Sequence, residues 1–441
     1  MAGSIASLGL PGRAGAQPAP AAVRPVMFTN VRLFDGKSDV LRDGLHVLVE
    51  SNRIKAVVAG NHPAPDGAHV IDCGGRVLMP GLIDAHWHSI FAAVSLPALL
   101  NADFGYIYLA AAAEAERTLM RGFTTIRDLG GPAFALKQAI DDGLVSGPRI
   151  YPSGAMITAT GGHADMRPLY DVPSVGSRLS RLEQTGASMI VDNPDLVRLR
   201  VREQFLQGAS QIKLVGSGGV ASPRSPLDVA NLTERELHAG VEAAADWNSY
   251  VAVHAYTPNT MQRAIAAGVR CIEHGHLMDE PTARLMSDKG IWLSIQPFLS
   301  TDDAAPMTGE SRQKLLQVIA GTDRAYRLAK AHNIKTAFGS DLLFSAPLTA
   351  RQGAMLTHLT RWHTPSEILR MATAANAELL GLSGPRNPYP GKLGLVEEGA
   401  LADLLLVDGN PLETISLVED PARNFLIIMK DGKIYKDTLK A

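Results

Sequence analysis

The segment MPGLIDAHWH, residues 79–88, is a short apolar run that ends in two histidines separated by one residue. In a β-strand, residues i and i+2 point to the same face, and they lie about 7 Å apart along the chain. His86 and His88 can therefore converge on one metal ion, while Trp87 points the other way. Taken alone, the pair also fits a strand that merely ends in polar residues, so the rest of the chain must decide between the two interpretations.

The composition limits the class of protein. The chain has 441 residues, of which 46% are hydrophobic, and a net charge of −2. This length predicts one large domain plus a smaller one, and the charge gives no support for a nucleic-acid partner. No run of about 18 uninterrupted apolar residues occurs, so we expect no transmembrane helix and no membrane partner. Cys73 and Cys271 lie in apolar, strand-like runs and are expected to be core thiols rather than a disulfide.

Short β-like segments occur at both ends of the chain. They are VMFTNVRLF, LHVLVESNRIKAVV and HVIDCGGRVLMP near the start, and ADLLLVDGNP and NFLIIMKDGKIYKD near the end. Asp-Gly-Lys stands in a hairpin-like context at 35–37 and again at 431–433. We expect residues 27–80 and 390–441 to form one small β-sandwich-like domain. Residues 1–26 are predicted to be a disordered tail or the remnant of an export signal, which leaves the compartment open between cytoplasm and periplasm.

The middle of the chain, residues 81–389, alternates between strand-like and helical patterns. The strand-like runs are GLIDAHWH, FTTIRDLGG, RIYPSGAMIT, QIKLVGSGG, YVAVHAY, CIEHGH, IWLSIQP and KTAFGSDLL. A long helix is expected from about Ser311 to His332, and two or more helices over Ala350–Leu382. Eight strands alternating with helices predict an α/β fold, a (β/α)8 TIM barrel, in which catalysis takes place at the C-terminal ends of the strands. Residues 159–192 form a long excursion, which is typical of a functional or mobile loop.

Polar residues stand at or near the ends of these predicted strands, namely His86, His88, Lys213, His254, His274 and Asp341. Each alone has a structural explanation as a core histidine, a snorkelling lysine or a turn aspartate. Together, in one layer of a barrel, they favour a metal site, because imidazole and carboxylate are ligands that zinc prefers. An ammonium cannot bind a cation, but reaction of Lys213 with carbon dioxide gives a bridging carbamate anion. Burial lowers the pKa of a lysine and makes that reaction easier.

From about residue 27 to 435 the sequence resembles the amidohydrolase superfamily, through PGLIDAHWH, QIKLVGSGG, VAVHAYTP, CIEHGH and FGSD. GGVASPRSPLD and TGGHADM point to the imidazolonepropionase-like branch, and in it to Xaa-Pro dipeptidases, carboxypeptidases and ochratoxin-hydrolysing amidohydrolases. The resemblance implies two divalent ions, with zinc as the default and manganese or cobalt open. His86, His88 and Asp341 would hold one ion, His254 and His274 the other, and N6-carboxylated Lys213 would bridge them. It also implies a homo-oligomer such as an octamer.

The same resemblance implies a reaction. A metal-activated hydroxide would attack the amide carbonyl of an N-acyl amino acid or a dipeptide, ochratoxin A included. Asp341 would accept the proton and pass it to the leaving nitrogen. His163 in GGHAD is a catalytic and substrate-binding candidate, with a structural loop histidine as the alternative. Tyr256 and Arg224 are candidates for binding a carboxylate; the alternatives are a wall residue and a solvated loop residue.

Neighbouring residues complete the expected site. Ile90, Phe91 and 342–344 predict an apolar pocket for an aromatic or aliphatic acyl group, with simple packing of the barrel rim as the alternative. Glu273 and Trp87 are expected to point outward as packing or ion-pair residues. His276 is expected to support the site or to be structural, and Asp128 to hold a turn, with a role in the pocket as its alternative.

Other functions stay open at this stage. A cyclic amide hydrolase shares the strand-four lysine. A mononuclear deaminase generally lacks it, so Lys213 counts against that activity. The intact ligand set argues against a non-catalytic scaffold.

Overall fold

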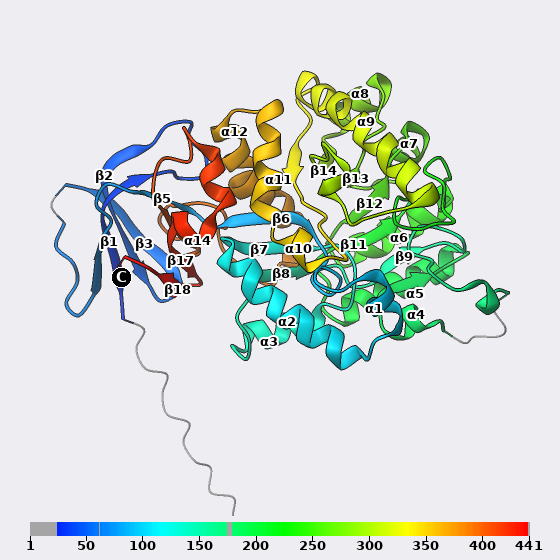
Figure 1. The fold of residues 1–441 in the computed structure, drawn as a ribbon, viewed down its shortest axis with the longest axis horizontal. Helices are drawn as coiled ribbons and strands as arrows, with labels where there is room; N and C mark the ends of the chain where they lie inside the picture. The colour runs from blue at the N-terminus through cyan, green and yellow to red at the C-terminus, as the bar shows by residue number, and fades with distance from the viewer. Residues whose placement is uncertain (1–23, 61, 174–178, 440–441) are drawn as a thin grey trace, which may run out of the picture.

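The computed structural model describes residues 24–60, 62–173 and 179–439. Residues 1–23, most of the segment predicted to be a tail or signal remnant, lie outside the described residues. Figure 1 shows a β-rich part built from both ends of the chain beside a larger part in which strands and helices alternate. None of the described helices is long and apolar enough to cross a bilayer.

The larger part contains the parallel strands that the alternating pattern predicts. They are β6 (Leu82–Trp87), β7 (Phe123–Asp128), β8 (Arg149–Pro152), β9 (Met156–Thr158), β11 (Ile212–Val215), β12 (Val251–Ala255), β13 (Cys271–His274), β14 (Trp292–Ile295) and β15 (Thr336–Phe338). The predicted third strand is divided, with β8 pairing to β7 and β9 pairing to β11. A short strand, β10 (Ser188–Ile190), pairs with β9 inside the long excursion.

Two sets of contacts link these strands into the predicted barrel. The Ser210 amide donates to the Pro152 carbonyl at 2.7 Å, which ties the chain before β11 to β8. The second set lies between β6 and β15. There the Asn376 side chain donates to the carbonyls of Ile83 (2.7 Å) and Phe338 (2.8 Å) and accepts from the Phe338 amide. One buried amide group thus joins β6 to β15, and the first and last strands of the barrel become neighbours.

Helices follow the strands and cover the barrel. They are α1 (Leu96–Asn101), α2 (Phe104–Met120), α3 (Phe134–Asp141), α4 (Arg181–Gln184), α5 (Pro194–Leu206), α6 (Glu234–Asp246), α7 (Pro258–Ala266), α8 (Glu280–Lys289), α9 (Gly309–Ala331), α10 (Ala346–Thr349), α11 (Gln352–His358), α12 (Pro365–Arg370) and α13 (Asn376–Gly381). Local sequence fixes their starts: Thr233 and Glu236 form a capping box at α6, and Asp279 caps α8.

The chain ends pair in one sheet. Its strands are β1 (Val26–Leu33), β2 (Arg42–Glu50), β3 (Arg53–Ala59), β4 (His69–Asp72), β5 (Val77–Pro80), β16 (Leu404–Val407), β17 (Phe425–Lys430) and β18 (Lys433–Asp437). The order is β18-β17-β16-β5-β1-β2-β3, with β4 on β1. The predicted hairpin at 431–433 joins β17 to β18, and the positive φ angles of Asp431 (54°) and Gly432 (73°) are those of a type I′ turn.

Alternation along these strands separates two hydrophobic cores. Leu404, Leu406 and Ile427 face a core confined to the terminal sheet, whereas Leu405 and Ile428 pack into the core of the barrel. Since the side-chain period of a strand is two, one sheet serves both cores. The sheet lies beside β6 and β7 in Figure 1, and it meets the start of β6, where the Gly81 amide donates to the Asp403 carbonyl.

Candidate metal centre

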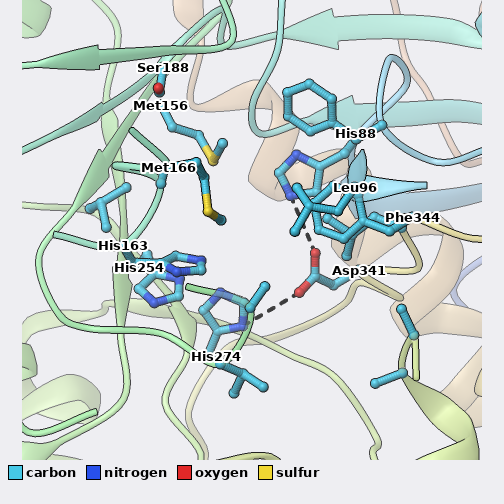
Figure 2. Close-up of a pocket in the computed structure, with 18 of the residues that line it drawn as sticks. His88, Leu96, Met156, His163, Met166, Ser188, His254, His274, Asp341 and Phe344 are labelled. Atoms are coloured by element: carbon cyan, nitrogen blue, oxygen red, sulfur yellow. Dashed lines mark ion pairs between the residues drawn. The ribbon is translucent and has the colours of Figure 1, made fainter. Parts of the chain in front are cut away.

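Three predicted ligands meet at the carboxyl ends of β6 and β15. Ligand atoms of His86, His88 and Asp341 all lie within 4.8 Å of one another. Asp341 Oδ1 is 3.4 Å from His86 Nε2 and 3.3 Å from His88 Nε2. Figure 2 shows the carboxylate between His88 and His274. Two imidazoles and a carboxylate at this spacing are a donor set that fits a zinc-type divalent ion.

Hydrogen bonds on the far side of each ring turn its free nitrogen toward the site. His86 Nδ1 donates to Glu273 Oε2 at 2.8 Å, and His88 Nδ1 donates to the Gly130 carbonyl at 3.1 Å. His274 Nδ1 donates to Gln296 Oε1 at 2.7 Å. In each ring Nε2 is left with its lone pair, because a neutral imidazole carries only one N–H. Such outer partners fix the tautomer of metal-binding histidines.

The remaining predicted ligands adjoin this group. The ring centroid of His274 is 4.4 Å from that of His254 and 5.0 Å from that of His86. His254 Nε2 lies 3.0 Å from the Gly218 carbonyl and donates to it, so Nδ1 is its free nitrogen. Lys213 lines the same pocket, and in the part of the chain that the structure describes its ammonium makes no hydrogen bond or ion pair. The structure thus brings all six predicted ligands to one place.

Burial shifts several basic groups of the site toward their neutral forms. Desolvation, together with neighbouring cationic groups, lowers the pKa of His86, His254 and His274 well below the usual value. Burial also lowers the pKa of the Lys213 ammonium, partly offset by the charges of Glu273 and Asp341. Neutral imidazole is the metal-binding form, and a neutral amine is the form that reacts with carbon dioxide. The electrostatics therefore suit the predicted ligand roles.

Backbone geometry at two ligands departs from regular strand structure, and it corrects one prediction. His274 (φ 77°) and Asp341 (φ 51°) have positive φ, a sparsely populated region that is typical of functional sites. Glu273, predicted to point outward, lies wholly buried on the inner side of β13 and contacts His86. The left-handed conformation of His274 breaks the alternation of the strand, so that consecutive residues both serve the site. Trp87 packs in the main hydrophobic core, which agrees with its expected packing role.

A pocket opens in front of these ligands. Its wall is mainly apolar, and Figure 2 shows Met156, Met166, Leu96 and Phe344 around the space before the histidines. The other large apolar residues are Phe91, Leu99, Leu182, Phe298, Met307, Leu315 and Leu343. Of the predicted apolar rim, Phe91, Leu343 and Phe344 line the pocket. Ile90 and Leu342 are buried in the core and are not among the lining residues.

The three substrate-binding candidates fall in different places. His163 lines the pocket, and its ring stacks on that of His254 with centroids 4.5 Å apart. Burial, with Lys213 and Lys314 nearby, lowers its pKa to about 3, so the ring is neutral. Tyr256 also lines the pocket and stacks on His274 at 4.9 Å. Arg224 is exposed and is not a lining residue, so the structure does not bring it to the other candidates.

Residues that the sequence analysis did not single out support the ligands. Arg127 on β7 donates to Glu273 Oε1 at 2.7 Å and to the Ala85 carbonyl at 2.6 Å. Gln296, which orients His274, directly follows β14. Its role could have been predicted, because polar residues at the ends of barrel strands commonly belong to the site. The role of Arg127 could not have been predicted in this way, because its partner Glu273 lies far away in the sequence. Asp128 accepts from the Ser89 and Gly130 amides, which is the expected turn role.

Comparison with known proteins gives consistent matches over most of the chain. The model of the amidohydrolase family matches residues 77–435. Ochratoxinase of Aspergillus niger is 32% identical over 440 aligned residues, which cover 92% of this chain and 85% of the relative. A crystal structure of a prolidase complexed with N-methylphosphonate-L-proline has a TM-score of 0.86 and 35% identity, covering 94% of this chain and 100% of that chain. A Xaa-Pro dipeptidase with methionine bound in its active site has a TM-score of 0.80 and 30% identity, covering 93% and 100% of the two chains.

Proposed function

Because this chain belongs to the amidohydrolase family, we propose that it is a binuclear metal-dependent hydrolase that cleaves the amide bond of N-acyl amino acids or dipeptides. The observation that carries the proposal is the meeting of His86, His88 and Asp341 in the lining of one apolar pocket with Lys213, which is buried and has no hydrogen-bond partner among the described residues. His86, His88 and Asp341 would hold one ion and His254 and His274 a second, with zinc as the default. Carboxylated Lys213 would bridge them.

The side chains of the pocket have separate parts in the reaction. Bound divalent ions would lower the pKa of a water molecule and polarise the carbonyl of the substrate. Asp341 is the one carboxylate among the described lining residues, and it would take the proton from the attacking water and give it to the leaving nitrogen. His163, neutral and facing the same space, would contact the substrate carbonyl or carboxylate. Tyr256 would hold the carboxylate of the leaving amino acid.

The wall of the pocket favours an apolar, uncharged acyl group. Apart from Asp341 and Lys213, no lining residue in the described chain is an acid, a lysine or an arginine. An α-ammonium placed there would lose its hydration, and Asp341, the one lining carboxylate among the described residues, is assigned to the metal, so such burial is costly. An aromatic acyl group would instead pack against thioethers and rings. Ochratoxin A, an aromatic acyl-phenylalanine, has this character, and a relative of this chain is an ochratoxinase.

Metal content and product release test the proposal together. The wild type is expected to contain about two metal ions per chain and to release amino acid from acyl-amino acids, ochratoxin A included. Lys213→Ala and Asp341→Asn should abolish release. Lys335→Ala, which removes an exposed lysine paired with Glu378, is the matched control and should keep full activity. Full metal with release only from cyclic amides would favour a cyclic amide hydrolase, and absence of bound metal would refute both.

A matched pair of substrates tests the acyl preference. 3-Phenylpropanoyl-phenylalanine and phenylalanyl-phenylalanine differ only in the α-ammonium. The wild type should hydrolyse the first with a kcat/KM at least about tenfold higher, because the ammonium finds no partner in the pocket. Equal values, or a preference for the dipeptide, would contradict the assignment of an uncharged acyl group.

A further inference from the structure

A buried lysine outside the proposed metal centre holds a loop of the pocket. Lys314 on α9 is only 7% exposed. Its ammonium donates to the carbonyls of Gly219 (2.9 Å), Ser222 (2.5 Å) and Ser225 (3.1 Å). All three N–H donors of the ammonium are thereby used. No carboxylate lies within ion-pair distance of it in the described chain, so its direct partners are the three carbonyls, and Glu310 on the same helix adds only a longer-range attraction.

The loop that Lys314 holds, residues 218–225, follows β11 and touches two histidines of the site. The Gly218 carbonyl accepts from His254 Nε2 at 3.0 Å. Gly219 lies flat against His163, since a Cβ at Gly219 would be 2.4 Å from both Cγ and Nδ1 of that ring. Ser222 Oγ accepts from the Ala164 amide at 3.1 Å, which ties the neighbour of His163 to the same loop.

The position of His163 depends on this loop because its own bonds do not fix it. His163 Nδ1 is buried and has no hydrogen-bond partner among the described residues. The ring is instead held between His254, on which it stacks, and Gly219. We propose that Lys314 is a positioning residue, which fixes the 218–225 loop and through it the His163 ring. This proposal rests on the proposed function, in which His163 contacts the substrate.

The first test measures the loop without any substrate. Deuterium uptake of peptides covering 216–226 and 160–167 should rise in Lys314→Met, because three buried carbonyls lose their donor. The matched control is Lys330→Met, which removes from the same helix a lysine that donates to the Trp362 carbonyl away from the pocket. Uptake in the control should equal that of the wild type. Unchanged uptake in Lys314→Met would overturn the proposal, whether or not the protein hydrolyses amides.

The second test is a double-mutant cycle with His163→Ala. If Lys314 acts through His163, Lys314→Met should lower kcat/KM about tenfold in the wild type and less than about twofold in the His163→Ala background. Bound metal should be the same in all four proteins. Equal losses in the two backgrounds would mean that Lys314 has only a general structural role, and would overturn the proposal. An inactive wild type would refute the proposed function, and the deuterium uptake would still decide the role of Lys314.

A second variant, Gly219→Ala, tests the same proposal in case Lys314→Met does not fold. Gly219→Ala adds only a methyl group, and that group must displace the His163 ring. It should lower kcat/KM about tenfold in the wild type but not in the His163→Ala background, where the colliding ring is absent. Full activity of Gly219→Ala would contradict the proposed dependence of His163 on this loop.

Discussion

At the scale of single residues, the site is defined by how each donor is oriented as much as by which donors are present. His86 meets Glu273, His88 meets a carbonyl, and His274 meets Gln296. Each partner accepts the one N–H of a neutral ring and leaves the other nitrogen free for a metal. The residues that orient the rings can therefore be tested by mutation in the same way as the predicted ligands.

Glu273→Gln should weaken metal binding without removing a ligand. The change removes the charge that holds His86 Nδ1–H and leaves Arg127 without its carboxylate. Metal affinity is expected to fall about 10–100-fold, which competition with a chromophoric chelator measures. Glu280→Gln is the matched control, since it alters an exposed Glu280–His332 pair of the same type. Equal affinities of the two variants would contradict an orienting role for Glu273.

At the scale of secondary-structure elements, the seam between β6 and β15 depends on a side chain from a helix. Asn376 begins α13 and satisfies backbone groups of both strands. Because Asp341 follows β15 and His86 lies on β6, this seam also sets the distance between two predicted ligands. The neighbouring segment 358–367 carries a half-buried polar group, His363.

Asn376→Leu should destabilise the protein by about 2–4 kcal/mol, because buried carbonyl and amide groups lose their partners. The free energy of unfolding in urea measures the change. Asn101→Leu, at an exposed helix position, should cost no more than about 0.5 kcal/mol. A cost for Asn376→Leu as small as that of the control would show that the strands pair across the seam without it.

The stability of the protein should fall in mild acid partly through His363. Burial lowers the pKa of His363 below its ordinary value of 6.5. Above pH 6.5 the ring is neutral in both states and its full contribution is present. As the pH falls below 6.5, the unfolded chain binds a proton that the folded chain resists, so the contribution is lost as the pH passes through the folded pKa. His363→Gln should therefore show a smaller loss of unfolding free energy between pH 7 and 5, and the exposed His238→Gln should not.

At the scale of the whole molecule, a charge cluster joins the sheet of the chain ends to the barrel, and two of its members, Arg149 and Asp403, are buried. Arg149 on β8 pairs with Asp403 at 2.9 Å and with Asp431 at 2.6 Å. Asp403 directly precedes β16, and Asp431 belongs to the turn between β17 and β18. One barrel side chain thus holds two segments of the terminal sheet.

Arg149→Met should destabilise the protein by about 3–5 kcal/mol, because the buried Asp403 carboxylate loses its ion-pair partner. Arg76→Met breaks the exposed Arg76–Asp408 pair and should cost at most about 1 kcal/mol. Urea unfolding followed by both circular dichroism and tryptophan fluorescence would measure the two values. Equal small costs would mean that apolar packing alone joins the terminal sheet to the barrel.

Much of the fold and most of the candidate metal centre could be predicted from local sequence. The spacing of apolar residues predicts the alternation of strands and helices. In a parallel barrel the carboxyl ends of the strands meet at one face. His86, His88, Lys213, His254 and His274 could therefore be placed from neighbours a few residues away. The division of the third strand into β8 and β9 could not, because it depends on which strands each half pairs with.

What the sequence by itself determined is the barrel and the set of candidate ligands, because both follow from periodicity. The tertiary structure alone decided which way Glu273 points, that Arg224 stays in solvent, and that His163 stacks on His254. It also placed Lys314 under the 218–225 loop. These features depend on the positive φ angle of His274 and on contacts between residues distant in the chain. Neither of these can be recognised from the periodicity of the sequence.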